Sequence, residues 1–138
     1  MAGDLDVRAC WSGGMATEVV ARDHAIVADE PVEVPGGGDT GMMPTELFCA
    51  ALASCFCLAL VFAARRAGVK VSAVAVRVRA RRAGAELRYE SLAVEASGNV
   101  SEGSLEDLLP RARRLCWVSN TLAAGTEVTY GAVDGDLL

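Results

Sequence analysis

Residues 44–68, PTELFCAALASCFCLALVFAARRAG, decide the fold of this chain. A proline followed by Glu46 suits the start of a helix, and two arginines followed by a glycine suit its end. Between these signals the stretch is apolar apart from Ser54. The pattern predicts one helix of about six turns, because an α-helix has 3.6 residues per turn.

This helix is apolar on every face, so it needs covering on every face. Its length also fits a membrane span. Against a span, much of the stretch is Ala and Cys, which are only mildly hydrophobic, and both flanks are typical of soluble strands and loops. We expect no membrane association, and instead a central helix packed on a sheet and covered on its other side by a second subunit.

The composition limits the possible functions. The chain has 138 residues, enough for one domain with a real core, and 52% of them are hydrophobic. A net charge of −5 argues against a nucleic-acid partner. The start, MAGDLDVRACW, lacks the basic and apolar regions of a signal peptide. Five cysteines without an exported context indicate a reducing compartment, so we expect a cytoplasmic protein.

Three short strands are predicted before the helix. Alternation of apolar and polar residues predicts strands at 5–11 and 15–21, and turn residues at 22–23 lead into a third at 24–28. The segment 31–43, PVEVPGGGDTGMM, is rich in Gly and Pro and is predicted to be a loop. The first part of the chain is therefore a small antiparallel meander.

Two longer strands follow the helix. In 69–82 valines alternate with arginines, which predicts a sheet with one exposed face. A second strand, 86–96, changes phase near Ser91, as a β-bulge would. A second helix starts at Ser104, residues 116–124 are short and mixed, and 126–133 are predicted to form a last strand. The order is β-β-β-α-β-β-α-β, an α+β fold, and we expect one domain over residues 1–138.

Most common kinds of active site are poorly supported. The single histidine, His24, lies in a predicted strand without a nucleophile motif nearby, which argues against serine-type catalysis. Cys55 and Cys57 would point about 200° apart on a helix, so they cannot chelate one metal ion. The glycines at 36–38 lack the Lys and Ser or Thr of a phosphate loop. We therefore expect neither a metal nor an organic cofactor, and the remaining reactive groups are thiols.

Two cysteines stand in recognisable sequence contexts. The segment Pro44–Phe56, PTELFCAALASCF, resembles the central-helix motif of the osmotically inducible protein C and organic hydroperoxide resistance (OsmC/Ohr) family, which ends in Cys. Residues 116–122, CWVSNTL, are similar to the family's second signature, usually Cys-Pro-x-Ser, with Trp117 in place of the proline. The loop around residues 29–41 also resembles family members. The resemblance covers nearly the whole chain.

The resemblance implies a thiol peroxidase that reduces organic hydroperoxides and forms an intertwined homodimer. Matching the motifs makes Cys55 the cysteine that attacks the peroxide and Cys116 the one that resolves the product as a disulfide. A dithiol, often a lipoyl group, would then reduce the pair. A disulfide needs two α-carbons within about 7 Å, so the second motif must pack against the middle of the central helix.

The chain departs from the family pattern at the groups that assist the peroxide-attacking cysteine. Peroxidase members place a glutamate directly after the helix-opening proline, where this chain has Thr45, and Glu46 comes one residue later. They also use an arginine from the N-terminal strands, for which Arg22 is a candidate. Thr45, Glu46 and Arg22 are thus possible supporting residues. The alternative is an OsmC-like protein that binds a small molecule or thiol with weak or no peroxidase activity.

Overall fold

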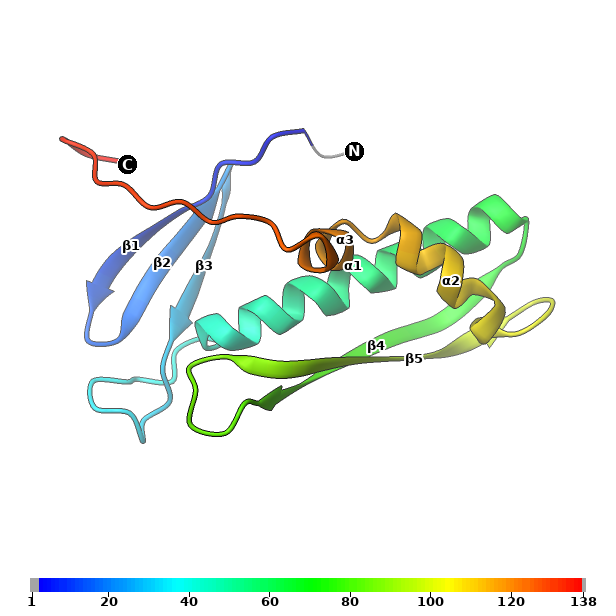
Figure 1. Cartoon of the computed structure of the whole chain (residues 1–138), viewed down its shortest axis with the longest axis horizontal. Coiled ribbons are helices and arrows are strands. Elements are labelled where there is room, and N and C mark those ends of the chain that lie inside the picture. Colours follow the sequence, from blue (N-terminus) through cyan, green and yellow to red (C-terminus); the bar gives the residue numbers. More distant parts are fainter. Residues whose placement is uncertain (1–2, 138) are drawn as a thin grey trace. The chain divides into compact units, whose positions relative to one another are not determined.

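The structure is a computed structural model, and it describes residues 3–137. The chain divides into two compact units. The first comprises Met1–Leu47 with Thr129–Leu138, and the second comprises Phe48–Val128. Figure 1 labels the strands and helices that make up each unit.

The first unit contains a three-stranded antiparallel sheet in the order β1-β2-β3. Its strands are β1 (Arg8–Gly13), β2 (Ala16–Ala21) and β3 (His24–Asp29). The β2–β3 turn places Arg22 at a φ of 54°, a left-handed conformation that two-residue hairpin turns of the primed types require. The predicted N-terminal meander is therefore confirmed, with strand ends shifted by a few residues (Figure 1).

The loop after β3 is held in place by the buried carboxylate of Asp29. This carboxylate accepts hydrogen bonds from the N–H of Gly38 at 3.2 Å, and from the N–H and hydroxyl of Thr40 at 3.1 and 2.6 Å. The Thr40 hydroxyl is the main cause of the lowered pKa of Asp29, and the backbone N–H groups lower it further, although burial opposes them. The glycine-rich segment is thus an ordered loop tied to the end of β3.

The central helix, α1 (Pro44–Ala67), confirms the helix predicted from its start and stop signals. The Glu46 carboxylate accepts a hydrogen bond of 2.9 Å from the N–H of Met43, the residue that precedes the helix. At the other end Gly68 has a φ of 71°, the left-handed conformation that commonly terminates helices.

By length and hydropathy alone, α1 could cross a membrane, since its most apolar 18-residue window has a mean hydropathy of 2.5. Core helices of soluble proteins often meet the same criterion. About a third of this window is buried inside the chain. Its buried side chains, with Leu60 fully enclosed, form the core of the second unit.

The second unit contains an antiparallel two-stranded ribbon of β4 (Val71–Arg82) and β5 (Tyr89–Val100). Arg81 pairs with Ser91 and Arg82 with Tyr89, so Glu90 is an extra residue in β5. The bulge predicted near Ser91 is therefore confirmed. A second irregularity lies in β4 between Ser72 and Ala75.

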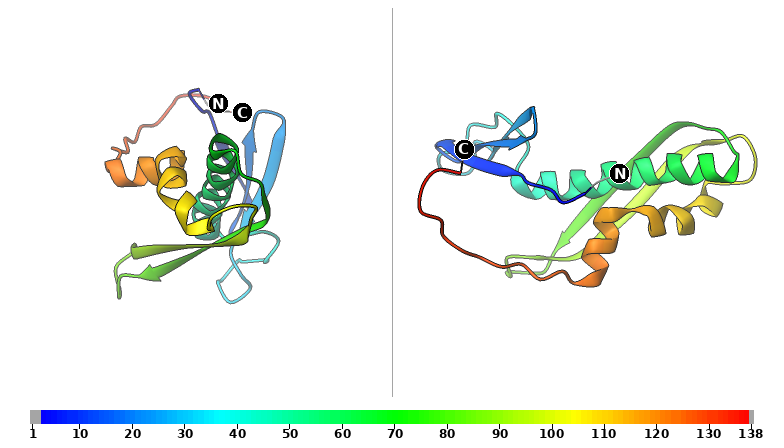
Figure 2. Two further views of the ribbon diagram at one scale, coloured as in Figure 1. Left: turned by 90° about the vertical axis from the view of Figure 1, so that its right-hand side faces the viewer. Right: turned by 90° about the horizontal axis from the view of Figure 1, so that it is seen from above.

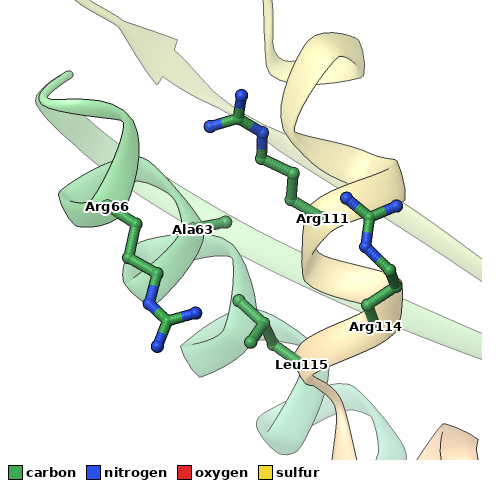
Figure 3. A pocket seen from close by; sticks show the side chains of 5 residues that line it. All are labelled: Ala63, Arg66, Arg111, Arg114 and Leu115. Atoms are coloured by element: carbon green, nitrogen blue, oxygen red, sulfur yellow. The ribbon is translucent and has the colours of Figure 1, made fainter.

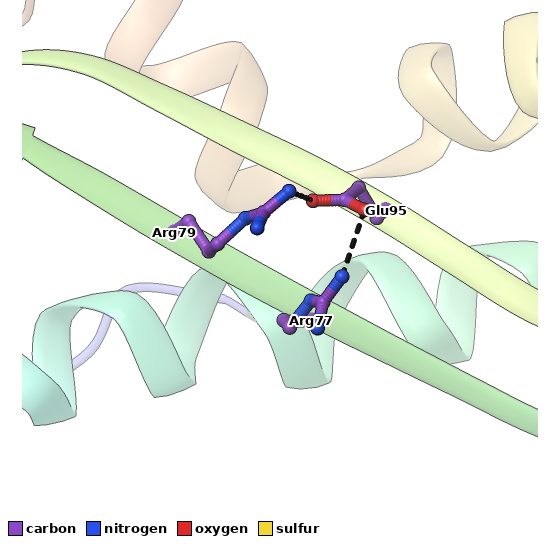
Figure 4. A network of polar contacts seen from close by, with 3 residues as sticks. All are labelled: Arg77, Arg79 and Glu95. Carbon is purple, nitrogen blue, oxygen red and sulfur yellow. Dashed lines mark hydrogen bonds and ion pairs between the residues drawn. The ribbon is translucent and has the colours of Figure 1, made fainter.

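The two faces of this ribbon differ in character, as the alternation predicted. Val74, Val76 and Val78 pack against the core of the unit. On the exposed face Glu95 forms ion pairs with Arg77 at 3.0 Å and Arg79 at 2.5 Å (Figure 4). Arg77, and then Arg79, lower the pKa of Glu95. These side chains are mostly solvated, so the pairs add little to stability.

Two helices complete the second unit: α2 (Leu105–Leu115) and α3 (Trp117–Ala124). Ser104 and Asp107 form a capping box at the start of α2, each side chain accepting a hydrogen bond from the other's backbone N–H. Leu108 and Ala112 of α2 are buried with the core residues of α1. The helices α1 and α2 therefore lie on the same side of the β4–β5 ribbon (Figure 2).

The prediction for the end of the chain was wrong in two respects. Residues 117–124 form α3, which ends at Gly125 in the left-handed conformation, φ 62°. Residues 126–133 form no strand, and the described sheets consist of β1–β3 and β4–β5 alone. Alternating apolar and polar residues form a strand only where the backbone can pair with a neighbouring strand. In this segment Val128 and Tyr130 remain exposed.

Candidate functional site

Cys55 and Cys116 meet in the core of the second unit. Cys55 lies near the middle of α1, half-buried and packed against the core cluster. Cys116 belongs to that cluster and is fully buried. The Cys116 thiol lies close enough to raise the pKa of Cys55, and both thiols are free in this structure. The second motif therefore packs against the central helix, as a disulfide between Cys55 and Cys116 requires.

Cys116 occupies the junction between α2 and α3. Its extended backbone, φ −85° and ψ 105°, ends one helix and begins the other. Its carbonyl accepts hydrogen bonds from the N–H of Asn120 at 3.0 Å and the hydroxyl of Ser119 at 3.2 Å. These bonds start α3 and leave the first N–H groups of that helix without partners inside it.

Those N–H groups contact Cys55. Burial raises the pKa of the Cys55 thiol, and the Cys116 thiol beside it raises it further. The backbone N–H groups of Val118 and Trp117 act in the opposite direction, because they donate hydrogen bonds to the sulfur. The net effect is a raised pKa, so Cys55 is mainly a neutral thiol at pH 7.

The three possible supporting residues lie in the first unit. Glu46 caps the start of α1 through Met43, and Thr45 is exposed in the first turn. Arg22 is exposed in the β2–β3 turn, and within residues 3–137 its side chain makes no hydrogen bond or ion pair. None of the three contributes to the pKa shift of Cys55. The structure therefore gives Glu46 a capping role at the start of α1.

The remaining cysteines have other surroundings. Cys57 donates a weak hydrogen bond to the carbonyl of Val74, with its sulfur 3.9 Å from the oxygen. Cys49, on α1, and Cys10, on β1, are half-buried and free. Cys57 thus faces the ribbon rather than Cys116, in agreement with the expected divergence of Cys55 and Cys57 around the helix.

Sequence reasoning missed the N–H groups at the start of α3. Their positions depend on the helix that begins directly after Cys116, and this segment was predicted only as short and mixed. One usable signal was present, because Gly125 directly follows a run ending in two alanines. A glycine at that place is typical of a helix end.

Fold and site together define an α+β protein whose long central helix presents one cysteine to a second cysteine at a helix junction. A family model described as OsmC-like protein matches residues 36–131. The chain therefore belongs to the OsmC-like protein family, as the sequence motifs predicted. No curated protein matches the chain in sequence.

Solved structures share the fold at low sequence identity. An OsmC-like protein from Mycoplasma pneumoniae is 14% identical with a TM-score of 0.78, covering 89% of each chain. An organic hydroperoxide resistance protein from Legionella pneumophila is 19% identical with a TM-score of 0.64, covering 88% of this chain and 90% of that one. One from Elizabethkingia anophelis is 24% identical with a TM-score of 0.63, covering 88% and 89%. These likenesses show the fold, and they span nearly all of each neighbour.

Proposed function

We propose that this protein is a thiol peroxidase that reduces organic hydroperoxides, with Cys55 as the attacking cysteine and Cys116 as the resolving one. The observation that carries the proposal is the packing of Cys55 against the buried core cluster that contains Cys116, although their two motifs lie about 60 residues apart in the chain. Membership of the OsmC-like family supports it. So do the names of two structural neighbours, which are called organic hydroperoxide resistance proteins.

The reaction proceeds in three balanced steps. The Cys55 thiolate attacks the terminal oxygen of the hydroperoxide, the O–O bond breaks, and the alkoxide takes a proton and leaves as an alcohol. Cys55 is then a sulfenic acid. The Cys116 sulfur attacks it, the S–O bond breaks, and water leaves as the disulfide forms. A dithiol such as a lipoyl group supplies two electrons and two protons and restores both thiols.

The residues around the pair suit these steps. The N–H groups of Trp117 and Val118 offset part of the cost of holding negative charge on the buried Cys55 sulfur. Cys116 is enclosed beside it, so a sulfenic acid formed on Cys55 meets a thiol before a second peroxide molecule. Rapid disulfide formation protects Cys55 from further oxidation.

A homodimer is part of the proposal. Phe48, Leu58 and Phe62 on α1 are 40%, 68% and 41% exposed. At 100° per residue they fall within about 80° of one another around the helix, and Cys55 lies in the same sector. A second subunit covering this apolar face would also cover the exposed side of Cys55. We propose a cytoplasmic location, because the five free cysteines need a reducing compartment.

The test is direct. Reduced protein is mixed with one equivalent of cumene hydroperoxide, quenched at short times and digested without reduction, and the linked peptides are identified by mass. We expect a Cys55–Cys116 disulfide with loss of the hydroperoxide. Cys55→Ser should abolish consumption, Cys116→Ser should stop at the sulfenic or sulfinic acid on Cys55, and Cys49→Ser, as control, should behave like wild type. Unselective oxidation of all five thiols would overturn the proposal.

A second candidate is an OsmC-like binding protein with weak or no peroxidase activity. It is favoured by one observation: among the described residues of the second unit, no cationic side chain is among the groups that shift the pKa of Cys55. Without such a charge a buried thiol is a slow nucleophile at neutral pH. This candidate predicts that hydroperoxide consumption by wild type and by Cys55→Ser differ little at pH 7.

A further inference from the structure

A second feature of the second unit lies away from the cysteine pair. The end of α1 and the end of α2 enclose an open cavity of about 230 Å³. Ala63 and Arg66 line it from α1, and Arg111, Arg114 and Leu115 line it from α2 (Figure 3). Three of its five lining residues are therefore arginines, in a chain whose net charge is −5.

Among residues 3–137, no carboxylate forms an ion pair with any of the three guanidinium groups. The ion pairs formed within residues 3–137 use Arg77, Arg79, Arg81 and Arg88, and none uses an arginine of the cavity. Arg66 stacks on the ring of Phe62, with its guanidinium carbon 4.9 Å from the ring centre.

Placement at helix ends explains part of this pattern but not all of it. Arginines in the last turns of α1 and α2 interact favourably with the helix dipoles. Arg65 and Arg113 satisfy that role equally well, yet neither lines the cavity. The cavity residues come from two separate helices that meet at this place. Arginine is suited to bidentate binding of carboxylate and phosphate groups.

The size and remaining walls of the cavity limit the ligand. Pockets that enclose drug-sized molecules measure roughly 300–1,000 Å³, so this cavity holds a head group and a few further atoms. Ala63, Leu115 and the methylene stems of the arginines supply apolar wall. We propose that the cavity binds the oxyanion head group, a carboxylate or a phosphate, of a small ligand with an apolar tail.

The proposal is tested by calorimetry on the full-length reduced protein at low salt. The probes are octanoate and octyl phosphate, with octanol as the neutral probe of equal tail length and inorganic phosphate as the anion without a tail. We expect 1:1 binding of at least one of the two octyl anions, with octanol and inorganic phosphate weaker by about tenfold or more. The better octyl anion identifies the head group.

Matched variants separate a site from general attraction. Arg111→Gln with Arg114→Gln should weaken binding of the octyl anion by at least about tenfold. Arg65→Gln with Arg113→Gln removes the same number of charges, one from each of the two helix ends, and should change binding by less than about threefold. If the first pair fails to fold, Arg66→Gln against Arg65→Gln makes the same comparison. The proposal would be overturned if both pairs of substitutions weakened binding equally, or if octanol bound more tightly than the octyl anions. It would also be overturned if neither octyl anion bound at millimolar concentration. The measurement uses no hydroperoxide, so its result is independent of the proposed peroxidase activity.

Discussion

Cys55 packs against the buried core cluster that contains Cys116, the residue at which α2 ends and α3 begins. This contact joins the middle of the central helix to a helix junction about 60 residues further along the chain. It also brings the first N–H groups of α3 to the Cys55 sulfur.

The reactivity of Cys55 should rise steeply with pH. Burial raises the pKa of this thiol above its ordinary value, so the reactive thiolate is a minor form at pH 7. We expect the rate of its alkylation by iodoacetamide to increase about tenfold for each pH unit between pH 6 and 8. The measurement is the mass-resolved labelling of the Cys55 peptide over time. A rate that levels off below pH 8 would show instead a thiol already ionised at neutral pH.

Oxidation of the pair should stabilise the protein. A Cys55–Cys116 disulfide would close a loop of about 60 residues, and the chain-entropy model gives roughly 4 kcal/mol for such a loop, less any native strain. The melting temperature of diamide-oxidised protein should therefore exceed that of the reduced protein. Cys116→Ser, treated in the same way, serves as the control and should show no increase. An oxidised wild type that melts at or below the reduced protein would contradict this expectation.

Leu60→Ala should destabilise the second unit strongly. Leu60 is fully buried in the core between α1 and its neighbours. Truncation of a buried leucine costs about 2–5 kcal/mol, because it removes apolar contacts and leaves a cavity. Urea denaturation followed by circular dichroism measures the change. Leu87→Ala, at a fully exposed position, is the matched control and should cost less than about 0.5 kcal/mol. Similar losses for both variants would rule out this account of the core.

Asp29→Asn should remove a pH-dependent part of the stability. The pKa of Asp29 is lowered in the folded state, so its contribution is present above the unfolded-state pKa and is lost as pH falls through the folded-state value. The stability difference between wild type and variant should therefore be largest near pH 6 and shrink below about pH 4. Denaturation midpoints across this range measure it. A difference between wild type and Asp29→Asn that stays constant across this pH range would contradict the assigned role.

The elements that the sequence predicts well are those with strong local signals. α1 carries its own start and stop residues, and the alternation of valine and arginine in β4 identifies both faces of the ribbon. The final strand was predicted wrongly. The alternation of apolar and polar residues near Val128 indicates a propensity to form a strand, but it does not show that a neighbouring strand is available to pair with. α3 was missed because its eight residues are too few to show a clear helical period.

The candidate site was predictable in its residues but not in its surroundings. The family motifs point to Cys55 and Cys116, and Glu46 caps α1 as its place in the first turn suggests. The N–H groups of Trp117 and Val118 have no signature of their own, since every residue carries the same backbone donor. The cavity arginines are equally hard to find, because α1 and α2 bring them together from positions about 45 residues apart.

The charged face of the β4–β5 ribbon has a consequence for solubility. Within residues 3–137 each of these two strands pairs only with the other, so each has an outer edge of unpaired backbone groups. Such edges act as templates for aggregation, and natural proteins guard them with charged side chains. The arginines of β4 and the glutamates of β5 thus contribute little to folding free energy yet keep the ribbon from adding foreign strands. Replacing them with threonine would leave the fold intact and make the protein prone to fibrils.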